Sequence, residues 1–243
     1  MTMTKPQNTT GKLYLIPCTL GETTAPLEVL PISIKQIIEH IDYYIVENEK
    51  TARRFIKKIS AGKVQSSLQL ETLNKFTEPG ELASFLNPCL EGKDMGVISE
   101  AGCPGVADPG AEIVKIAHEK GIQVVPMVGP SSILLALMAS GFNGQNFAFN
   151  GYLPIDSADK KGAIKRLERV SKEQNQSQIF IETPYRNDKL LAELLKSLHP
   201  NTKLCVACDI TLPTEYIVTK TVADWKKAVL LLHKRPTIFI IQA

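Results

Sequence analysis

The chain has 243 residues and a mass of 26.8 kDa, which is more than one average domain and favours two. Apolar residues make up 44% and charged residues 22%, as in ordinary globular proteins, and this excludes a disordered or collagen-like chain. The net charge of +3, from 28 basic and 25 acidic residues, is too small to indicate nucleic-acid binding by itself, so only local basic clusters can argue for it.

The first ten residues and the cysteines bear on the cellular compartment. Met1–Thr10 is polar and lacks the apolar stretch of a signal peptide, so we expect a flexible lead-in. No apolar run approaches the ~20 residues needed to cross a bilayer. The five cysteines are an odd number, which is typical of reduced thiols. We therefore expect a cytoplasmic protein that is not organised by disulfides and has no membrane segment.

Short β-branched runs alternate with helical patterns from end to end, which is typical of α/β units on largely parallel sheets. The pattern predicts about nine strands in two α/β domains, 1–127 and 128–243, with the junction near Val128. Clear strands are expected at 13–16, 43–47, 96–99, 123–126, 146–152, 178–182, 204–209 and 238–241, and 214–218 is expected to add antiparallel pairing. Helices are expected at 33–41, 51–59, 80–90, 111–119, 131–140, 160–172 and 187–198.

The densest group of turn residues is the segment Ser99–Gly110, which holds three glycines and two prolines directly after a predicted strand. Such a loop lets the backbone approach a ligand at the carboxyl end of a sheet strand, where open α/β folds bind ligands. Asp108 and Pro109 form a good N-cap and first-turn pair, so the next helix is expected to point its free N–H groups towards the loop. The alternative is a plain connection between a strand and a helix.

Two well-known nucleotide loops do not fit this segment. Gly105 and Gly110 have the Walker spacing, but Ala111-Glu112 replaces the lysine and hydroxyl residue that meet phosphate and Mg²⁺. The glycines do not form the G-x-G-x-x-G pattern of dinucleotide sites either. A ligand other than ATP with magnesium, or NAD, is therefore expected.

Four motifs in a fixed order carry a resemblance to a known family. They are Ser99–Gly110, Pro126–Ser132 with Ser140-Gly141 behind it, Phe149–Pro154, and Phe180–Arg186. Together they resemble the tetrapyrrole (corrin/porphyrin) methylase superfamily, and within it most closely the branch of small-subunit ribosomal RNA (cytidine-2′-O)-methyltransferases. The resemblance runs from about residue 13 to residue 241.

This resemblance implies an S-adenosylmethionine-dependent methyltransferase of two α/β domains, usually a homodimer, with the cofactor in a cleft between the domains and small-subunit ribosomal RNA as the partner. The cofactor is a cationic sulfonium with an adenine, a ribose and an amino-acid end, so it needs backbone groups, hydroxyls and an apolar wall more than a metal. The cofactor-binding residues carried over from the family are Pro17, Gly102, Cys103, Pro104, Val106, Ala107, Ser131, Ser132, Ala207, Cys208 and Asp209.

Three positions depart from the family pattern. Cys103 stands where threonine or aspartate is common, and Tyr185 replaces a histidine in the turn before Arg186. Where an acidic-Asp-Thr-Arg run often follows the second strand, this chain has Glu47-Asn48-Glu49-Lys50-Thr51. These changes bear more on the identity of the methyl acceptor than on the cofactor.

Two further groups of side chains are candidates for the chemistry. Glu182 and Arg186 flank a Thr-Pro turn, so they are candidate catalytic residues, one orienting or deprotonating a hydroxyl and the other pairing with a phosphate or carboxylate. The alternative is a mutual ion pair that holds the turn. Arg53 and Arg54, in a basic helix with Lys57 and Lys58, are candidate substrate-binding residues for an RNA backbone, the alternative being a solvated helix face.

A metal site is not predicted. Cys205 and Cys208 have the C-x-x-C spacing but fall inside an apolar strand, where they point to opposite faces. The four histidines are scattered without ligand spacing. Two other functions stay open beside the RNA methyltransferase: a methylase of a corrin or porphyrin precursor, and a non-catalytic nucleotide-binding module in which Cys103 and Tyr185 mark lost chemistry.

Overall fold

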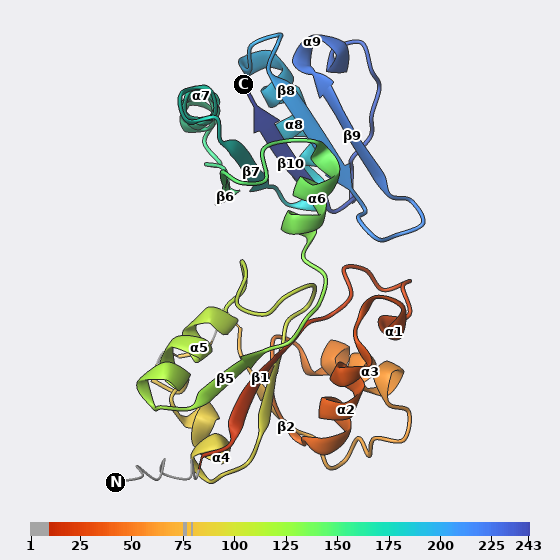
Figure 1. Ribbon diagram of the computed structural model, residues 1–243, viewed down its shortest axis with the longest axis vertical. Coiled ribbons are helices and arrows are strands. Elements are labelled where there is room, and N and C mark those ends of the chain that lie inside the picture. The colour runs from red at the N-terminus through yellow and green to blue at the C-terminus, as the bar shows by residue number, and fades with distance from the viewer. Residues whose placement is uncertain (1–9, 75–76, 79) are drawn as a thin grey trace, which may run out of the picture. The chain divides into compact units, whose positions relative to one another are not determined.

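The computed structural model describes residues 10–74, 77–78 and 80–243, so most of the predicted lead-in, Met1–Thr10, lies outside the described residues. The chain divides into two compact units, residues 1–130 and 131–243 (Figure 1). The division falls between Pro130 and Ser131, whereas the sequence pattern predicted the junction near Val128. Both units are α/β structures, as predicted.

The first unit is built on a five-stranded sheet in which every pair of neighbouring strands is parallel. The strand order is β3-β2-β4-β1-β5, so β1 and β4, which are far apart in sequence, lie side by side at the centre. The strands are β1 (Lys12–Ile16), β2 (Tyr43–Val46), β3 (Gln69–Thr72), β4 (Met95–Ile98) and β5 (Gln123–Pro126).

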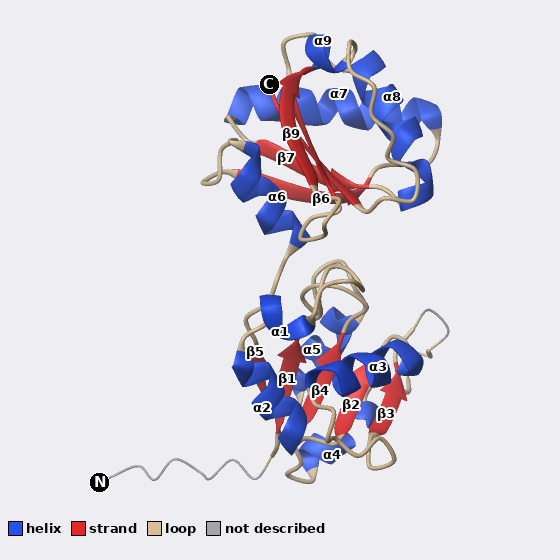
Figure 2. Ribbon diagram, turned by 90° about the vertical axis from the view of Figure 1, so that its right-hand side faces the viewer, coloured by secondary structure: helices blue, strands red, loops and turns tan. Residues whose placement is uncertain are grey.

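Helices cover both faces of this sheet because alternate strand residues are apolar on each face (Figure 2). One core joins Ile16, Tyr44 and Ile98 to the helices that follow β1 and β2. The other joins Leu13 and Val97 to the helices around β4. The first face carries α1 (Pro26–Val29), α2 (Ile32–His40) and α3 (Glu49–Ile59), and the second carries η1 (Ser84–Leu86), α4 (Asn87–Leu90) and α5 (Gly110–Glu119).

The second unit has a mixed sheet in the order β6-β7-β10-β8-β9. β7 and β8 are both antiparallel to β10 and therefore run parallel to each other, which brings their carboxyl ends to the same edge of the sheet. The elements are α6 (Ser132–Ser140), β6 (Phe147–Tyr152), α7 (Ser157–Gln174), β7 (Ser177–Ile181), η2 (Pro184–Arg186), α8 (Asn187–Ser197), β8 (Lys203–Cys208), β9 (Tyr216–Thr221), α9 (Val222–Trp225) and β10 (Thr237–Gln242).

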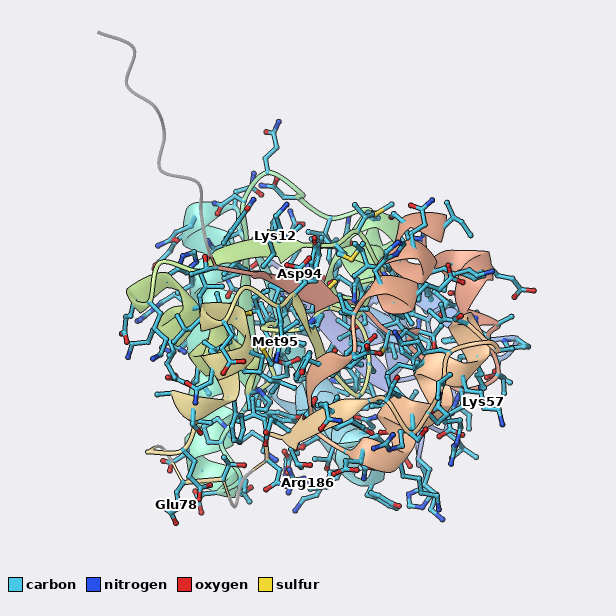
Figure 3. All side chains as sticks on the ribbon, turned by 90° about the horizontal axis from the view of Figure 1, so that it is seen from below. Lys12, Lys57, Glu78, Asp94, Met95 and Arg186 are labelled. Atoms are coloured by element: carbon cyan, nitrogen blue, oxygen red, sulfur yellow. The ribbon has the colours of Figure 1, made fainter. Side chains whose placement is uncertain are left out.

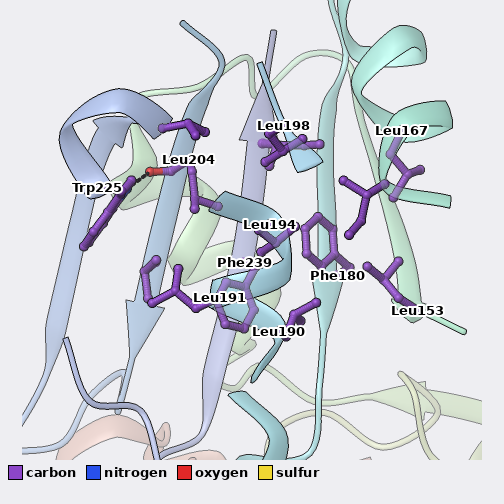
Figure 4. Close-up of a cluster of buried hydrophobic side chains, with 14 of the residues drawn as sticks. Leu153, Leu167, Phe180, Leu190, Leu191, Leu194, Leu198, Leu204, Trp225 and Phe239 are labelled. Atoms are coloured by element: carbon purple, nitrogen blue, oxygen red, sulfur yellow. Dashed lines mark hydrogen bonds between the residues drawn. The ribbon is translucent and has the colours of Figure 1, made fainter. Parts of the chain in front are cut away.

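The main core of the second unit lies between this sheet and the helices α7, α8 and α9 (Figure 4). Phe180 and Phe239 stack with ring centroids 6.1 Å apart, on the neighbouring strands β7 and β10. Trp225 is buried and its indole N–H donates to the carbonyl oxygen of Leu204 over 2.8 Å, which satisfies its one polar group. Trp225 and Phe239 both belong to this core.

Two local predictions were wrong, and a third shifted by two residues. The helix expected at 80–90 is replaced by the 3-10 turn η1 and the short helix α4, because Pro88 has no N–H and is accommodated only in a first turn. The short edge strand β3 was missed, since it alternates without a fully buried face and has only one β-branched residue. The antiparallel strand expected at 214–218 is confirmed as β9, which pairs with β8 and begins at Tyr216 rather than Thr214.

Candidate functional site

The carboxyl ends of β1 and β4 form the topological switch point of the first unit. The helices after β1 pack on one face of the sheet, whereas α5, which follows β4, packs on the other face. The chain therefore leaves two adjacent strands in opposite directions, and loops at such a point open a crevice above the sheet edge. The Ser99–Gly110 loop leaves β4 at this point.

Backbone contacts join the loop after β1 to the loop after β4. The N–H of Cys18 donates to the carbonyl oxygen of Gly102 over 2.8 Å, and the Ser99 hydroxyl donates to the same oxygen over 3.3 Å. Gly102 has a φ of +70°, and a Cβ there would meet the carbonyl oxygen of Pro130 at 3.3 Å. The loop thus needs glycine at this position both for its backbone conformation and for its packing.

The end of β5 closes the same edge. A Cβ on Gly129 would lie 2.2 Å from Cβ of Pro17, so the two backbones can touch only because residue 129 is glycine. The thiol of Cys103 donates to the carbonyl oxygen of Pro130 over 3.4 Å. Three predicted cofactor residues, Pro17, Gly102 and Cys103, therefore lie together at the carboxyl edge of the first sheet.

The remaining predicted residues of this loop differ in exposure. Pro104 is buried, whereas Val106 and Ala107 are exposed on the outer part of the loop. Ala107 adopts a φ of +60°, a conformation that is unusual for a residue other than glycine. Unusual backbone conformations of this kind concentrate at ligand sites.

Asp108 holds the loop and the first amide of α5 together. One carboxylate oxygen accepts the N–H of Gly105 at 2.7 Å and that of Gly110 at 2.8 Å. The helix begins at Gly110 with Pro109 as its N-cap residue, so the predicted cap position was one residue too early, although the side chain still receives a helix N–H. The cause is that Asp108 must also reach back to Gly105.

Acidic side chains surround this edge. Glu47, at the end of β2, accepts the N–H of Glu100 over 3.1 Å. Burial raises the pKa of Glu47, and the neighbouring charges of Asp108 and Glu100 add to the rise. Burial also raises the pKa of Asp108, although the N–H groups of Gly105 and Gly110 oppose the rise. These three carboxylates form no ion pair with any residue in the described part of the chain.

A pocket of about 170 Å³ lies in the first unit beside the loop. Its apolar wall includes Ala52, Phe55 and Ile98, and burial, with the charges of Glu100 and Glu47, raises the pKa of Cys18 in the same wall well above its ordinary value. A neutral, buried thiol of this kind is not a nucleophile. The pocket therefore offers a binding surface rather than a reactive cysteine.

The polar rim of the pocket comes from the start of α3 and from two loops. Asn48 caps α3 by accepting the N–H of Lys50 and of Thr51, and the Thr51 hydroxyl donates to Glu100 over 2.5 Å. Lys58 donates to the carbonyl oxygen of Glu22 over 3.1 Å. The rim thus presents a hydroxyl, a carboxylate and cationic groups around an apolar wall.

The two predicted substrate-binding arginines have different surroundings. Arg54 lines the pocket and pairs with Glu22 at 3.7 Å. Arg53 donates to the carbonyl oxygen of Gln65 over 2.7 Å and pairs with Glu49 at 3.7 Å, so its guanidinium is already engaged within the unit. Lys57 extends outwards from the same helix (Figure 3).

Sequence reasoning missed Thr51, Lys58 and Glu100 as pocket residues. The Glu47–Thr51 segment was recognised as a departure from the family pattern, so a signal for this side of the site existed in the sequence. The sequence did not show that Glu100, the second residue of the loop after β4, faces Thr51 at the start of α3.

Glu182 and Arg186 form an ion pair at the end of β7 in the second unit. A guanidinium nitrogen of Arg186 donates to Glu182 over 2.6 Å, and the N–H of Thr183 donates to the same carboxylate oxygen over 2.7 Å. Although burial works against it, these two donors lower the pKa of Glu182. Arg186 Nε is buried and has no hydrogen-bond partner among the described residues, whereas the side chain as a whole is 41% exposed.

A second arginine pair lies at the end of β8, on the same edge of the second sheet. Arg235 donates through Nε to Asp209 over 2.8 Å, and the Thr214 hydroxyl donates to the same carboxylate oxygen over 2.8 Å. Ala207 and Cys208 are buried in the strand, and Asp209 has a φ of +51°. Of the predicted cofactor residues in this unit, these three therefore lie together at one strand end.

Ser131 and Ser132 begin α6 at the first positions of the second unit. Ser131 is the N-cap residue, and its hydroxyl accepts the N–H of Leu134 over 3.5 Å. Among the described residues, no group of three or more His, Cys, Asp or Glu side chains could hold a metal ion. No described helix is both long and apolar enough to pass through a membrane.

Comparison with known proteins gives consistent matches. The family described as "Tetrapyrrole (Corrin/Porphyrin) Methylases" matches residues 36–225. Ribosomal RNA small subunit methyltransferase I of Buchnera aphidicola subsp. Schizaphis graminum is 26% identical over 237 residues, which covers 96% of this chain and 79% of that protein. The protein of the same name from Neisseria meningitidis serogroup A is 27% identical over 219 residues, covering 90% and 70%.

The crystal structure of the methyltransferase CobJ has the same fold. It superposes with a TM-score of 0.63 at 16% sequence identity, covering 96% of this chain and 94% of that one. At this low identity the match concerns the fold and carries no information about the substrate.

Proposed function

The chain belongs to the tetrapyrrole (corrin/porphyrin) methylase family and is a methyltransferase, and from this premise we propose that it transfers a methyl group from S-adenosylmethionine to a ribose 2′-hydroxyl of small-subunit ribosomal RNA. The observation that carries the choice of substrate is the similarity, over nearly the whole chain, to proteins that are named for methylation of this RNA. The site in the first unit supports the choice of donor.

The carboxyl edge of the first sheet has the chemistry that this donor requires. S-adenosylmethionine, when bound, supplies an electrophilic methyl group on a positively charged sulfonium. The Gly102–Ala107 loop offers backbone groups whose close approach Gly102 permits, and the carboxylates of Glu47, Glu100 and Asp108 give the edge a negative potential. Pro17, Gly102, Cys103, Pro104, Val106 and Ala107 would hold the donor from this side.

The contributions of the second unit follow from the family resemblance. Ser131, Ser132, Ala207, Cys208 and Asp209 are proposed as further donor contacts. Asp209 is held in a fixed position by Arg235 and Thr214, which is what a residue that orients a polar ligand needs.

We assign the acceptor nucleotide to the pocket beside the loop. Arg54 and Lys58 on its rim suit a phosphate, and the Thr51–Glu100 pair suits a sugar hydroxyl. A volume of about 170 Å³ is below the about 300–1,000 Å³ of sites that enclose whole drug-sized ligands, so this pocket suits one sugar or base. Alignment of the hydroxyl with the methyl group would then supply much of the acceleration.

The catalytic assignment of Glu182 and Arg186 stays a prediction, and their geometry favours a positioning role. A carboxylate whose pKa is lowered is a weak base for a ribose hydroxyl, since it holds a proton only in acid. The Arg186 side chain is 41% exposed, so its guanidinium suits a phosphate or carboxylate oxygen of a ligand. We also propose a homodimer that works in the cytoplasm, as the resemblance implies.

Mass spectrometry of small-subunit ribosomal RNA tests this function. Small subunits from cells lacking the protein are incubated with the purified chain and methyl-labelled S-adenosylmethionine, and the RNA is digested to nucleosides. We expect one labelled 2′-O-methylnucleoside with the wild type and none with the Gly102→Val variant. Donor binding without any labelled nucleoside would reject the RNA substrate, and a porphyrin precursor that becomes methylated under the same conditions would replace it.

A further inference from the structure

The longest helix, α7, carries a row of exposed cations on its outer face. Lys161, Lys165, Arg169 and Lys172, called the basic stripe below, are spaced by four, four and three residues. At 3.6 residues per turn they fall within about 80° of the helix circumference and span about 17 Å. The opposite face, with Ile164 and Leu167, packs into the core, as Leu167 does in Figure 4.

The stripe is only weakly neutralised within the protein. Lys161 and Lys172 form no ion pair with any residue that the structure describes. Lys165 pairs with Glu168 at 3.3 Å, but that carboxylate also accepts the N–H of His199 and the hydroxyl of Thr202. Arg169 reaches Glu173 only at 4.0 Å, with both side chains exposed. Arg166, beside the stripe, adds a further exposed cation without an ion pair among these residues.

Folding does not require this arrangement. Like charges four residues apart, as in Lys161–Lys165 and Lys165–Arg169, destabilise a helix by about 0.2–0.5 kcal/mol per pair. The second unit as a whole carries 15 basic and 10 acidic residues, whereas the first carries 13 and 15. The excess positive charge of the chain is therefore concentrated in the unit that presents the stripe, which points to an external polyanion.

We propose that the basic stripe of α7 binds the phosphate backbone of RNA, at a place separate from the pocket in the first unit. The inference rests on the proposed function, which names RNA as the acceptor. Lysine and arginine side chains at intervals of about 5–6 Å match a run of phosphates, each of which needs one cation. A membrane surface fits less well, because a helix that lies on lipid needs an exposed apolar face and that of α7 is buried in the core.

Salt-dependent RNA binding tests the stripe directly. The probe is a fluorescein-labelled 20-nucleotide oligouridylate, and the readout is fluorescence anisotropy between about 50 and 200 mM KCl. In the stripe variant, Lys161, Lys165, Arg169 and Lys172 are all changed to Gln. In the matched control, the exposed Lys12, Lys115, Lys203 and Lys226 are changed to Gln, which removes the same net charge from scattered positions.

We expect the stripe variant to lose about 2–3 from the slope of log K against log salt, since each lost contact to a single strand is worth about 0.7. The control variant should keep at least three quarters of the wild-type slope. With small-subunit RNA as methyl acceptor, the stripe variant should raise KM about tenfold or more and leave kcat within about twofold, because the stripe lies outside the reacting groups. A variant in which each stripe lysine becomes arginine, and Arg169 becomes lysine, should bind as the wild type does.

Equal slopes for the stripe and control variants would overturn the proposal, as would stripe-dependent binding to vesicles of anionic phospholipid in place of oligouridylate. The binding assay does not use methyl transfer. If the wild type binds RNA through the stripe but methylates none, the proposed function is wrong and the proposed role of the stripe is kept. If the wild type methylates RNA and the stripe variant has the same salt slope as the wild type, the proposed function is kept and the role of the stripe is wrong.

Discussion

The two sheets end in edges of opposite electrostatic character. At the first, Glu47, Glu100 and Asp108 lie together without an arginine or lysine partner among the described residues, and the pKa values of Glu47 and Asp108 are raised. At the second, Glu182 and Asp209 are each bound by an arginine, and the pKa of Glu182 is lowered. The carboxylates at the first edge have no cationic partner among the described residues, whereas those at the second edge are paired with arginines of the same unit.

This difference matches the two charges that the proposed reaction brings together. An unpaired acidic edge gains stability when a cation such as a sulfonium binds to it, since no lysine or arginine among the described residues forms an ion pair with these carboxylates. The second unit, with its arginine pairs and its basic stripe, carries the positive excess that an RNA backbone needs. We therefore propose the acidic edge as the surface for the cationic donor and the second unit as a surface for the flanking RNA backbone, with the acceptor nucleotide in the pocket of the first unit.

The largest expected effect tests the first edge as the donor site. Gly102→Val places a branched side chain at a φ of +70°, against the carbonyl oxygen of Pro130. To relieve the strain and the contact, which together cost about 1–3 kcal/mol, the loop after β4 must move, so affinity for S-adenosylmethionine, measured by calorimetry, should fall about tenfold or more.

Gly121→Val is the matched control for this substitution. Gly121 has the same φ of +70° and lies in the first unit, but a Cβ there meets nothing within 4 Å. It should lower the stability of the unit by a similar amount and leave donor affinity unchanged. Equal loss of affinity in the two variants would mean that the loop after β4 is not where the donor binds.

The next effect tests the satisfied edge. Glu182→Gln keeps the shape of the side chain but removes the charge that Arg186 binds, so it should destabilise the protein by about 1–3 kcal/mol at pH 7. Because the pKa of Glu182 is below its ordinary value of 4.5 in the folded protein, the pair contributes fully above that pH and is lost as the pH falls through the folded pKa. Thermal unfolding at a series of pH values should therefore show the wild type and the variant converging in acid.

A positioning role for Glu182 makes a separate prediction about activity. The variant should change kcat and KM for RNA without moving the pH dependence of kcat, since the carboxylate would not carry the proton. A general base at this position predicts the opposite, namely the loss of an acidic limb from the wild-type profile. The measurement is the rate of methyl transfer as a function of pH for both proteins.

The fold was largely predictable because its signals are local. The apolar runs at Leu13–Ile16 and Met95–Ile98, and the helical patterns that follow most strands, indicate an α/β structure without knowledge of contacts. The segment around Pro88 was mispredicted because proline is accommodated only in the first turn of a helix. The edge strand β3 was missed because it is stabilised by pairing with a neighbouring strand. Neither feature can be recognised from the periodicity of apolar residues.

The candidate site was predictable where backbone geometry demands glycine or proline. The family resemblance singled out Pro17, Gly102 and Cys103, and the structure brings them together with Gly129, which lies in the Pro126–Ser132 motif. The pocket residues Thr51, Lys58 and Glu100 could not, since common polar residues acquire a role only through the partner that the fold brings to them. The pairing of Arg53 with Gln65 likewise cannot be inferred from spacing.

A smaller effect tests the pocket beside the acidic edge. Arg54→Gln and Lys58→Gln each remove one exposed cation from the rim, so each should raise KM for RNA a few-fold, by about 0.5–1 kcal/mol, and leave donor affinity unchanged. Arg53→Gln is the control within the same helix, because its guanidinium is bound to Gln65 and Glu49 and does not line the pocket. An equal rise in KM for all three variants would indicate a general charge effect of α3 rather than a defined acceptor pocket.

The smallest expected effect is at Glu47, where the change in stability with pH has the opposite sign to that at Glu182. Because the pKa of Glu47 is raised in the folded protein, its ionised form is disfavoured there, and stability is lost as the pH rises from the ordinary value of 4.5 through the folded pKa. Glu47→Gln keeps an oxygen to accept the N–H of Glu100 and removes the repulsion from Asp108 and Glu100. The variant should therefore be more stable than the wild type at pH 7, by less than about 1 kcal/mol, with no difference in strong acid.

The Glu47→Gln variant should also bind S-adenosylmethionine more weakly, since the same unpaired charge attracts the sulfonium. A Glu47→Gln protein that is destabilised at pH 7, or that binds the donor as tightly as the wild type, would show that the acidic edge serves the fold and not the ligand.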